Sequence, residues 1–146
     1  MKKLLLIITC LFCMTTTFGM ADDDRPIRVE QLPAKAQQFI KTHFADSRIA
    51  ISKVDTDWFD KTYEVIFTNG DKIEFNRSGE WKDIDCKHSA VPEAAVPEQI
   101  KNYIRTNYQG AVVLSLEKDK NSYEVKLSNR VELEFDKWFN LIDIDM

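Results

Sequence analysis

Two pairs of aspartates have the residue type and spacing that most suggest a binding site. Asp83 and Asp85 stand two positions apart in one strand-like run, and Asp143 and Asp145 repeat that spacing in another. Alternate side chains of a strand point to the same side, so each pair projects from one face of its strand. Paired carboxylates can attract a basic or polar protein partner, or hold a cation. A regular strand lacks the looped backbone carbonyls typical of calcium sites, so the pattern favours a protein partner and predicts no metal or cofactor.

The same alternation gathers more carboxylates around these pairs. Four of them oppose the apolar residues of their own strands: Glu64, Glu74, Glu124 and Glu134. Trp81 and Leu141 are expected on the same open face. Two interpretations remain. The face is an acidic surface with aromatic anchors for a partner, or it is a solvated polar face balanced by cross-strand Lys72 and Lys126.

Two aromatic dipeptides lie in predicted turns. Trp58-Phe59 falls between two strand-like runs, and Trp138-Phe139 falls in the last predicted hairpin. Large aromatic side chains at hairpin tips either dock on a partner or fold back over the edge of the core. We treat both dipeptides as candidate partner-binding residues and keep the core-capping alternative open.

Few residues are available for catalysis. The mature chain offers Cys86 and two histidines, His43 and His88. A cysteine nucleophile needs a histidine held beside it, and no third group that would orient His88 is apparent. Cys86 continues the apolar alternation of Ile84, which predicts a buried thiol. Metal-ligand spacings, phosphate-binding glycine loops and nucleophile elbows do not occur in the sequence, so we expect no enzyme.

The elements that position these residues are repeated along the chain. Residues 32–44 resemble residues 96–108, and the run Tyr63-Glu64-Val65 returns as Tyr123-Glu124-Val125. In each copy a proline stands where a helix begins, followed by apolar residues on one helical face. The spacing predicts helices over 33–45 and 97–108.

Strand-like runs follow each helix. In the first copy they span about 49–56, 63–68, 72–75 and 81–86, with Asn69-Gly70 as a hairpin signal. In the second copy they span 112–119, 122–128, 131–136 and 140–145. The predicted fold class is α+β: two tandem units, each a helix plus a four-stranded antiparallel meander, with the helices on one face of a joined, curved sheet. The first unit covers residues 22–86, a linker covers 87–95, and the second unit covers 96–146.

Residues 1–21 have the pattern of a cleavable secretory signal. Lys2 and Lys3 precede the apolar run of residues 4–14, and small residues lead to Ala21. The run is shorter than the roughly 20 residues of a membrane-spanning helix. We expect cleavage after Ala21, a periplasmic or secreted protein, and no membrane attachment after cleavage. The formal net charge of −4 argues against nucleic acid as a partner.

The order of motifs resembles a known family. Leu-Pro or Val-Pro opening a helix, then Tyr-x-Val, Glu-Phe and a Trp-x-x-Ile strand, is similar to the PepSY-like periplasmic proteins, whose fold is compared with the β-lactamase inhibitory protein. The resemblance covers about residues 28–146 and implies an exported α+β protein with helices on one face of an antiparallel sheet. Its motifs mark architecture and carry no catalytic residue.

We therefore expect an exported, non-enzymatic binding module, of which an inhibitor is one form. Its open sheet face and aromatic loops would bind a protein or peptide. The alternative is a small-molecule or cation binder, or an accessory protein of a hydrolase, that uses the acidic face.

Overall fold

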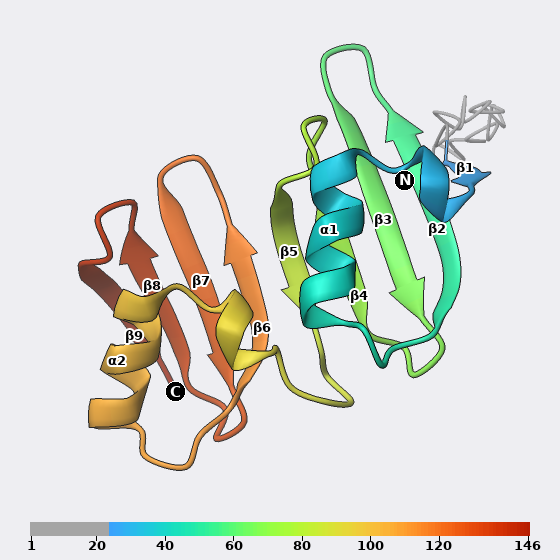
Figure 1. Cartoon of the computed structure of the whole chain (residues 1–146). Coiled ribbons are helices and arrows are strands. Elements are labelled where there is room, and N and C mark those ends of the chain that lie inside the picture. Colours follow the sequence, from blue (N-terminus) through green and yellow to red (C-terminus); the bar gives the residue numbers. More distant parts are fainter. Residues whose placement is uncertain (1–23) are drawn as a thin grey trace, which may run out of the picture.

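The computed structural model describes residues 24–146, which form one antiparallel sheet with two helices on one of its faces (Figure 1). Nine strands lie side by side in sequence order: β1 (Arg25–Ile27), β2 (Ile49–Thr56), β3 (Lys61–Phe67), β4 (Lys72–Phe75), β5 (Trp81–Asp85), β6 (Val113–Lys118), β7 (Ser122–Leu127), β8 (Glu132–Asp136) and β9 (Leu141–Asp145). The helices are α1 (Ala34–His43) and α2 (Glu98–Asn107), each preceded by a short 3-10 turn, η1 (Val29–Gln31) or η2 (Glu93–Ala95).

The predicted fold class, two helix-plus-four-strand units, is wrong. The described strands form a single nine-stranded sheet, because β5 pairs with β6 and places Ile84 opposite Leu116. The ninth strand, β1, pairs with β2 and has no place in the predicted units. Helix is limited in residues 24–146 to two ten-residue α-helices and two 3-10 turns, so the molecule is mostly sheet. The hairpins are local in sequence, whereas β5 and β6 are separated by α2, so the sequence pattern could not show that pairing.

Each helix begins directly after a proline. Pro33 and Pro97 are the N-cap residues and have extended backbone dihedrals, so the helices start one residue later than predicted. Ala36 and Ile40 are the buried positions of α1, and Ile100 and Ile104 are those of α2. Their four-residue spacing puts each pair on one face of its helix, which packs on the sheet.

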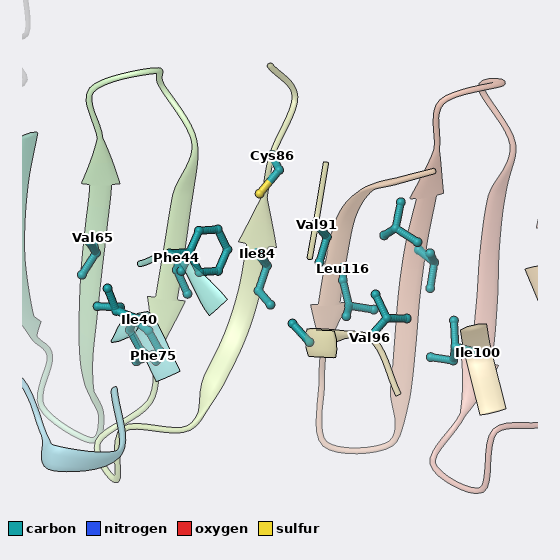
Figure 2. Packing of buried hydrophobic residues seen from close by; sticks show 14 of the residues in the cluster. Ile40, Phe44, Val65, Phe75, Ile84, Cys86, Val91, Val96, Ile100 and Leu116 are labelled. Carbon is teal, nitrogen blue, oxygen red and sulfur yellow. The ribbon is translucent and has the colours of Figure 1, made fainter. Parts of the chain in front are cut away.

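One hydrophobic core runs across the join between β5 and β6. Figure 2 shows Ile84 on β5 and Leu116 on β6, with Val91 and Val96 beside them. All four are buried, and Ile84 and Leu116 have no exposed surface. The residues that link the two parts of the sheet therefore belong to the same core as the residues under the helices.

Four hairpin positions have a left-handed backbone. Gly70 and Gly79 have φ of 90° and 85°, and Arg130 and Phe139 have φ of 70° and 67° at the corresponding positions of the second half. A Cβ on Gly79 would lie 2.7 Å from Pro33, so the close approach of this hairpin to α1 also requires glycine. Arg130 and Phe139 take the same conformation despite the steric cost of a side chain there.

The predicted signal peptide, residues 1–21, and the cleavage site after Ala21 lie outside the described residues. Within residues 24–146, neither helix is long and apolar enough to cross a membrane.

Candidate binding face

A single row of carboxylates crosses the sheet from β3 to β9. Its seven members lie directly opposite one another, strand by strand: Glu64, Glu74, Asp83, Glu117, Glu124, Glu134 and Asp143. We call this set the acidic row. Its members alternate along the strands with residues such as Val65, Ile73 and Leu133, which are fully buried on the helix side. The row therefore lies on the open face of the sheet.

Directly opposed side chains in a sheet have Cβ atoms about 4.5–5.5 Å apart, so like charges meet at every step of this row. Lysines relieve part of the repulsion. Lys53 lies opposite Glu64 in the register, with its Nζ 3.3 Å from a Glu64 carboxylate oxygen, and Lys72 makes a longer contact of 3.8 Å to the same glutamate. Lys82 Nζ lies 3.4 Å from Glu74. Lys126 Nζ lies 3.5 Å from Glu124.

Asp83 is the most perturbed member of the row. Burial raises its pKa to about 6, and the negative charges of Glu117, Asp85 and Glu74 act in the same direction, against an opposing effect of Lys72. A carboxyl with this pKa exchanges its proton near neutral pH.

A second row, beside the first, mixes charges. It contains Lys72, Asp85, Ser115, Lys126, Glu132 and Asp145 in register. Asp85 is mostly buried and pairs with Lys87 at 3.1 Å. Asp145 and Asp143 line a small hollow of about 130 Å³ at the β9 end, together with Glu124, Glu132 and Glu134.

Trp58 and Phe59 lie at the tip of the β2–β3 hairpin. Their side chains are 93% and 95% exposed, and within residues 24–146 neither ring contacts another aromatic ring. Asp57 accepts a hydrogen bond from the Trp58 backbone N–H, which helps to hold the loop. This tip does not fold back over the core.

The two residues of the second aromatic dipeptide differ in their exposure. Trp138 is 70% exposed, and Lys137 Nζ lies 4.4 Å from the centre of its ring. Phe139 is half-buried and stacks on Tyr123 with ring centroids 4.9 Å apart. Trp138 remains available at the surface, whereas Phe139 packs against the body of the sheet.

Trp81 does not share the open face with the acidic row, contrary to the alternation expected from sequence. The register shifts between Glu74 and Phe75, so Trp81 lies opposite Phe75 and packs against the core. The same shift between Glu134 and Phe135 moves Leu141 to the helix side. A β-bulge adds one residue and reverses the facing of the residues beyond it.

Trp81 lines a shallow hollow of about 420 Å³ between hairpin tips. Its other walls include Asp60, Arg77, Lys118 and Lys120. A second hollow of about 400 Å³ lies by the end of α2, with apolar walls that include Val91 and Ile104. Neither contains a member of the acidic row.

The potential catalytic residues do not form a nucleophilic site. Cys86 is fully buried, as predicted, and burial raises its pKa to about 12, with the charge of Asp71 acting in the same direction. A thiol with this pKa is not a thiolate at neutral pH. His88 is exposed and lies against Gly70, and His43 is half-buried and packs on the Phe39 ring at 4.6 Å.

Comparison with known proteins identifies one family. A family described as "Putative beta-lactamase-inhibitor-like, PepSY-like" matches residues 61–143, from β3 to within β9. The chain belongs to the PepSY-like family. No curated protein matches the chain.

Solved structures similar to this PepSY-like protein come from Bacteroides. A "putative periplasmic protein" from Bacteroides vulgatus is 60% identical, with a TM-score of 0.84 over 86% of this chain and 99% of that one. A "putative calcium-regulated periplasmic protein" from Bacteroides thetaiotaomicron is 59% identical, with a TM-score of 0.83 over the same shares. A second Bacteroides vulgatus periplasmic protein "of unknown function" is 34% identical, with a TM-score of 0.77 over 84% of this chain and 99% of that chain.

Sequence reasoning missed one member of the acidic row in this PepSY-like chain. Glu117 connects the carboxylates of β5 to those of β7, and without it the row would be two separate groups. The counterpart of Glu117 in the first half is Lys53, since each lies opposite the glutamate of a Tyr-Glu-Val run. That exchange of lysine for glutamate is visible in the sequence, but its meaning depends on the pairing of β5 with β6.

Proposed function

We propose that this protein is an exported, non-catalytic binding module that takes a cationic protein or peptide on the open face of its sheet. The acidic row carries the proposal. Among the ion pairs within residues 24–146, none involves Asp83, Glu117, Glu134 or Asp143, so four of the seven members of the row have no direct ion-pair partner. A line of like charges across a sheet is costly for folding. A partner that brings lysine or arginine side chains onto the face relieves that cost when it binds.

The exposed aromatic residues support the same proposal. Trp58 and Trp138 stand out from hairpin tips, and tryptophan is among the residues most often central to protein interfaces. Trp81 lies on the helix side and has no part in this face. Export is supported by the predicted signal peptide and by the periplasmic description of the similar structures. The buried, protonated thiol of Cys86 supports the absence of nucleophilic catalysis at that residue.

The test is a calorimetric titration with an acetylated peptide of alternating lysine and valine. The triple variant Glu74→Gln, Glu117→Gln, Glu134→Gln removes three charges from the row while keeping the shape of the side chains. We expect it to bind the peptide at least about tenfold more weakly than the unaltered protein. Affinity of the unaltered protein should also fall as salt concentration rises.

The matched control removes three charges elsewhere. Glu30, Asp46 and Glu93 are exposed and lie outside the strands, so the variant Glu30→Gln, Asp46→Asn, Glu93→Gln removes the same amount of negative charge from the protein. It should bind the peptide within about twofold of the unaltered protein. Equal losses in both triple variants would mean that net charge alone attracts the peptide, and the proposed face would be wrong.

A divalent cation is the second candidate ligand of the same face. The name of the Bacteroides thetaiotaomicron protein includes calcium regulation, and five carboxylates surround the hollow at the β9 end. Against it, no three His, Cys, Asp or Glu side chains within residues 24–146 are close enough to hold a metal ion as they stand. Calcium also prefers several oxygen ligands, including looped carbonyls, that a flat strand does not provide.

Thermal unfolding with added calcium chloride separates the two candidates. A calcium site in the hollow raises Tm at millimolar calcium, an increase that Glu134→Gln removes and that magnesium chloride does not reproduce. Under the first proposal, calcium and magnesium chloride change Tm alike, as general screening of the row by divalent ions.

A further inference from the structure

The same short sequence meets two different surroundings in this sheet. The ends of β5 and β9 share the run Asp-Ile-Asp, at residues 83–85 and 143–145, and the next residue is Cys86 or Met146. Ile84 and Cys86 are fully buried beside β6, whereas Ile144 is 41% and Met146 is 94% exposed. Within residues 24–146, no strand pairs with the outer side of β9.

The backbone donors of the two strands show what the outer side of β9 lacks. The N–H of Cys86 donates to the carbonyl of Leu114 in β6 at 2.7 Å. Donors alternate in direction along an antiparallel strand, so Ile84 also directs its N–H toward β6. By the matching register, the N–H groups of Ile144 and Met146 point away from β8. They donate instead to side chains: Ile144 to Asp143 at 2.9 Å and Met146 to Asp145 at 2.8 Å.

The acidic row gives the charge that a further strand would need. At its β3 end the row meets a lysine of β2, Lys53, which lies opposite Glu64 and forms an ion pair with it. At its β9 end the row stops at Asp143, for which residues 24–146 provide no ion pair. A strand laid against β9 would place one of its residues opposite Asp143, where a lysine or arginine would close the row as Lys53 does.

We propose that the outer edge of β9 accepts an extended segment of a cationic partner protein as a tenth strand. The segment alternates basic residues, which face Asp143 and Asp145, with apolar residues, which cover Ile144 and Met146. On binding, its carbonyls take over the N–H groups of Ile144 and Met146, and the two aspartates turn to the incoming cations. Strand addition of this kind uses backbone hydrogen bonds for affinity and alternate side chains for specificity. The proposal rests on the proposed function and adds a second contact: one segment of the partner extends the sheet at β9, while other basic side chains of the same partner lie over the acidic row.

A second copy of this chain is the less suitable occupant. Antiparallel pairing of two β9 edges would bring Asp143 and Asp145 of one copy opposite the same aspartates of the other. Directly opposed like charges destabilise a sheet. The carboxylates that cap the edge also discourage such association, as charged residues on edge strands commonly do.

The test compares three peptides on the full exported protein. The first is the acetylated lysine–valine peptide, the second has glutamate in place of lysine, and the third is the lysine–valine peptide with alternate backbone amides N-methylated. N-methylation of the edge that meets β9 removes donors and adds bulk without changing charge. We expect the first peptide to bind and the other two to bind at least about tenfold more weakly. Hydrogen exchange at the Ile144 and Met146 amides should slow on addition of the first peptide alone.

A variant adds an independent readout. Ile144→Pro removes an N–H that makes no bond to β8, and proline is tolerated on an edge strand. Its Tm should stay close to that of the unaltered protein while binding of the lysine–valine peptide falls at least about tenfold. The matched control, Ile144→Val, should retain binding. If Ile144→Pro unfolds the protein, the N-methylated peptide and the exchange measurement still decide the question.

The outcomes separate this inference from the proposed function. Binding of the N-methylated peptide as tightly as its parent, with unchanged exchange at Ile144 and Met146, contradicts the edge proposal and leaves the open face as the site. Binding of no cationic peptide contradicts both. A dimer of the protein alone, with Ile144 and Met146 already protected, identifies a second copy as the occupant and overturns the proposal.

Discussion

Asp83 of β5 lies directly opposite Glu117 of β6, in the strand pair that joins the two parts of the sheet. Two carboxylates in this relationship repel each other. The join is nonetheless held by the buried pair Ile84 and Leu116 one residue along, on the other face. The same strand pair therefore places the core on one face and the middle of the acidic row on the other.

The raised pKa of Asp83 predicts that the protein loses stability as pH rises. Its pKa lies at about 6 in the folded protein, against an ordinary value of 3.8. The folded state thus holds the Asp83 proton more tightly than the unfolded state. The stabilisation of the folded protein by this proton is complete below pH 3.8 and is lost as pH rises through 6. Asp83→Asn should be more stable than the unaltered protein at pH 7, by about 1 kcal/mol after allowance for partial exposure.

Urea unfolding at pH 4 and pH 7 measures this effect. The advantage of Asp83→Asn should shrink toward zero at the lower pH. Carboxyl-carbon NMR of the unaltered protein should give a titration midpoint near 6 for Asp83. A midpoint near 4, or an equal advantage at both pH values, would show that Glu117, Asp85 and burial do not affect Asp83 as described.

The exposed tryptophans should matter for binding and not for folding. Trp58→Ala and Trp138→Ala should each change the free energy of unfolding by less than about 0.5 kcal/mol, because both side chains are largely exposed. Phe139→Ala, at the next position, should cost about 1 kcal/mol through its lost stack on Tyr123. Urea unfolding gives all three values, and peptide titration gives their effects on binding. An early-melting Trp58→Ala would mean that this side chain caps the core.

Arg130 should be a point of backbone strain. Its φ of 70° lies in the left-handed region, where glycine has no steric penalty. Arg130→Gly should therefore stabilise the protein by about 0.5–1 kcal/mol. Arg130→Ala is the control, since alanine removes the side chain but keeps the Cβ, and it should bring no such gain. Equal stabilisation by both changes would point to the arginine charge and not to the backbone.

The Cys86 thiol should be protected by the fold. It is fully buried and its pKa is raised to about 12. A maleimide reagent should label it slowly in the folded protein and rapidly in denaturant, since the thiolate is the reactive form. Rapid labelling of the folded protein near neutral pH would contradict the buried position of Cys86 at the end of β5.

Features that depend on neighbours in the sequence could be predicted, and those that depend on long-range pairing could not. Proline at the helix start and the four-residue spacing of Ile100 and Ile104 locate α2 within a residue at each end. The buried position of Cys86 also follows from strand alternation. The pairing of β5 with β6 involves strands far apart in the sequence, and no local signal indicates it. A joined sheet was expected, but the predicted fold class is wrong because the described strands form one nine-stranded sheet, β1 included, and not two helix-plus-four-strand units.

The candidate site likewise has features that could be predicted from the sequence and features that could not. Strand alternation places Glu74, Asp83, Glu134 and Asp143 on one face, and the structure adds that they are cross-strand neighbours. It fails at Trp81, because the register shift after Glu74 cannot be read from a sequence of alternating residues. The acidic row as one continuous feature requires Glu117, and hence the order of all the strands.

The central claim is that the open sheet face, along the acidic row, binds a cationic partner. The most direct measurement is an NMR titration of the exported protein with the lysine–valine peptide, following the side-chain carboxyl carbons. We predict that the largest shift changes fall on members of the row, from Asp83 and Glu117 at its centre to Glu134 and Asp143 at its β9 end, and that added salt suppresses them. Shift changes confined to the Trp58 and Trp138 loops, or to the apolar hollow by α2, with the row unchanged at saturating peptide, would contradict it.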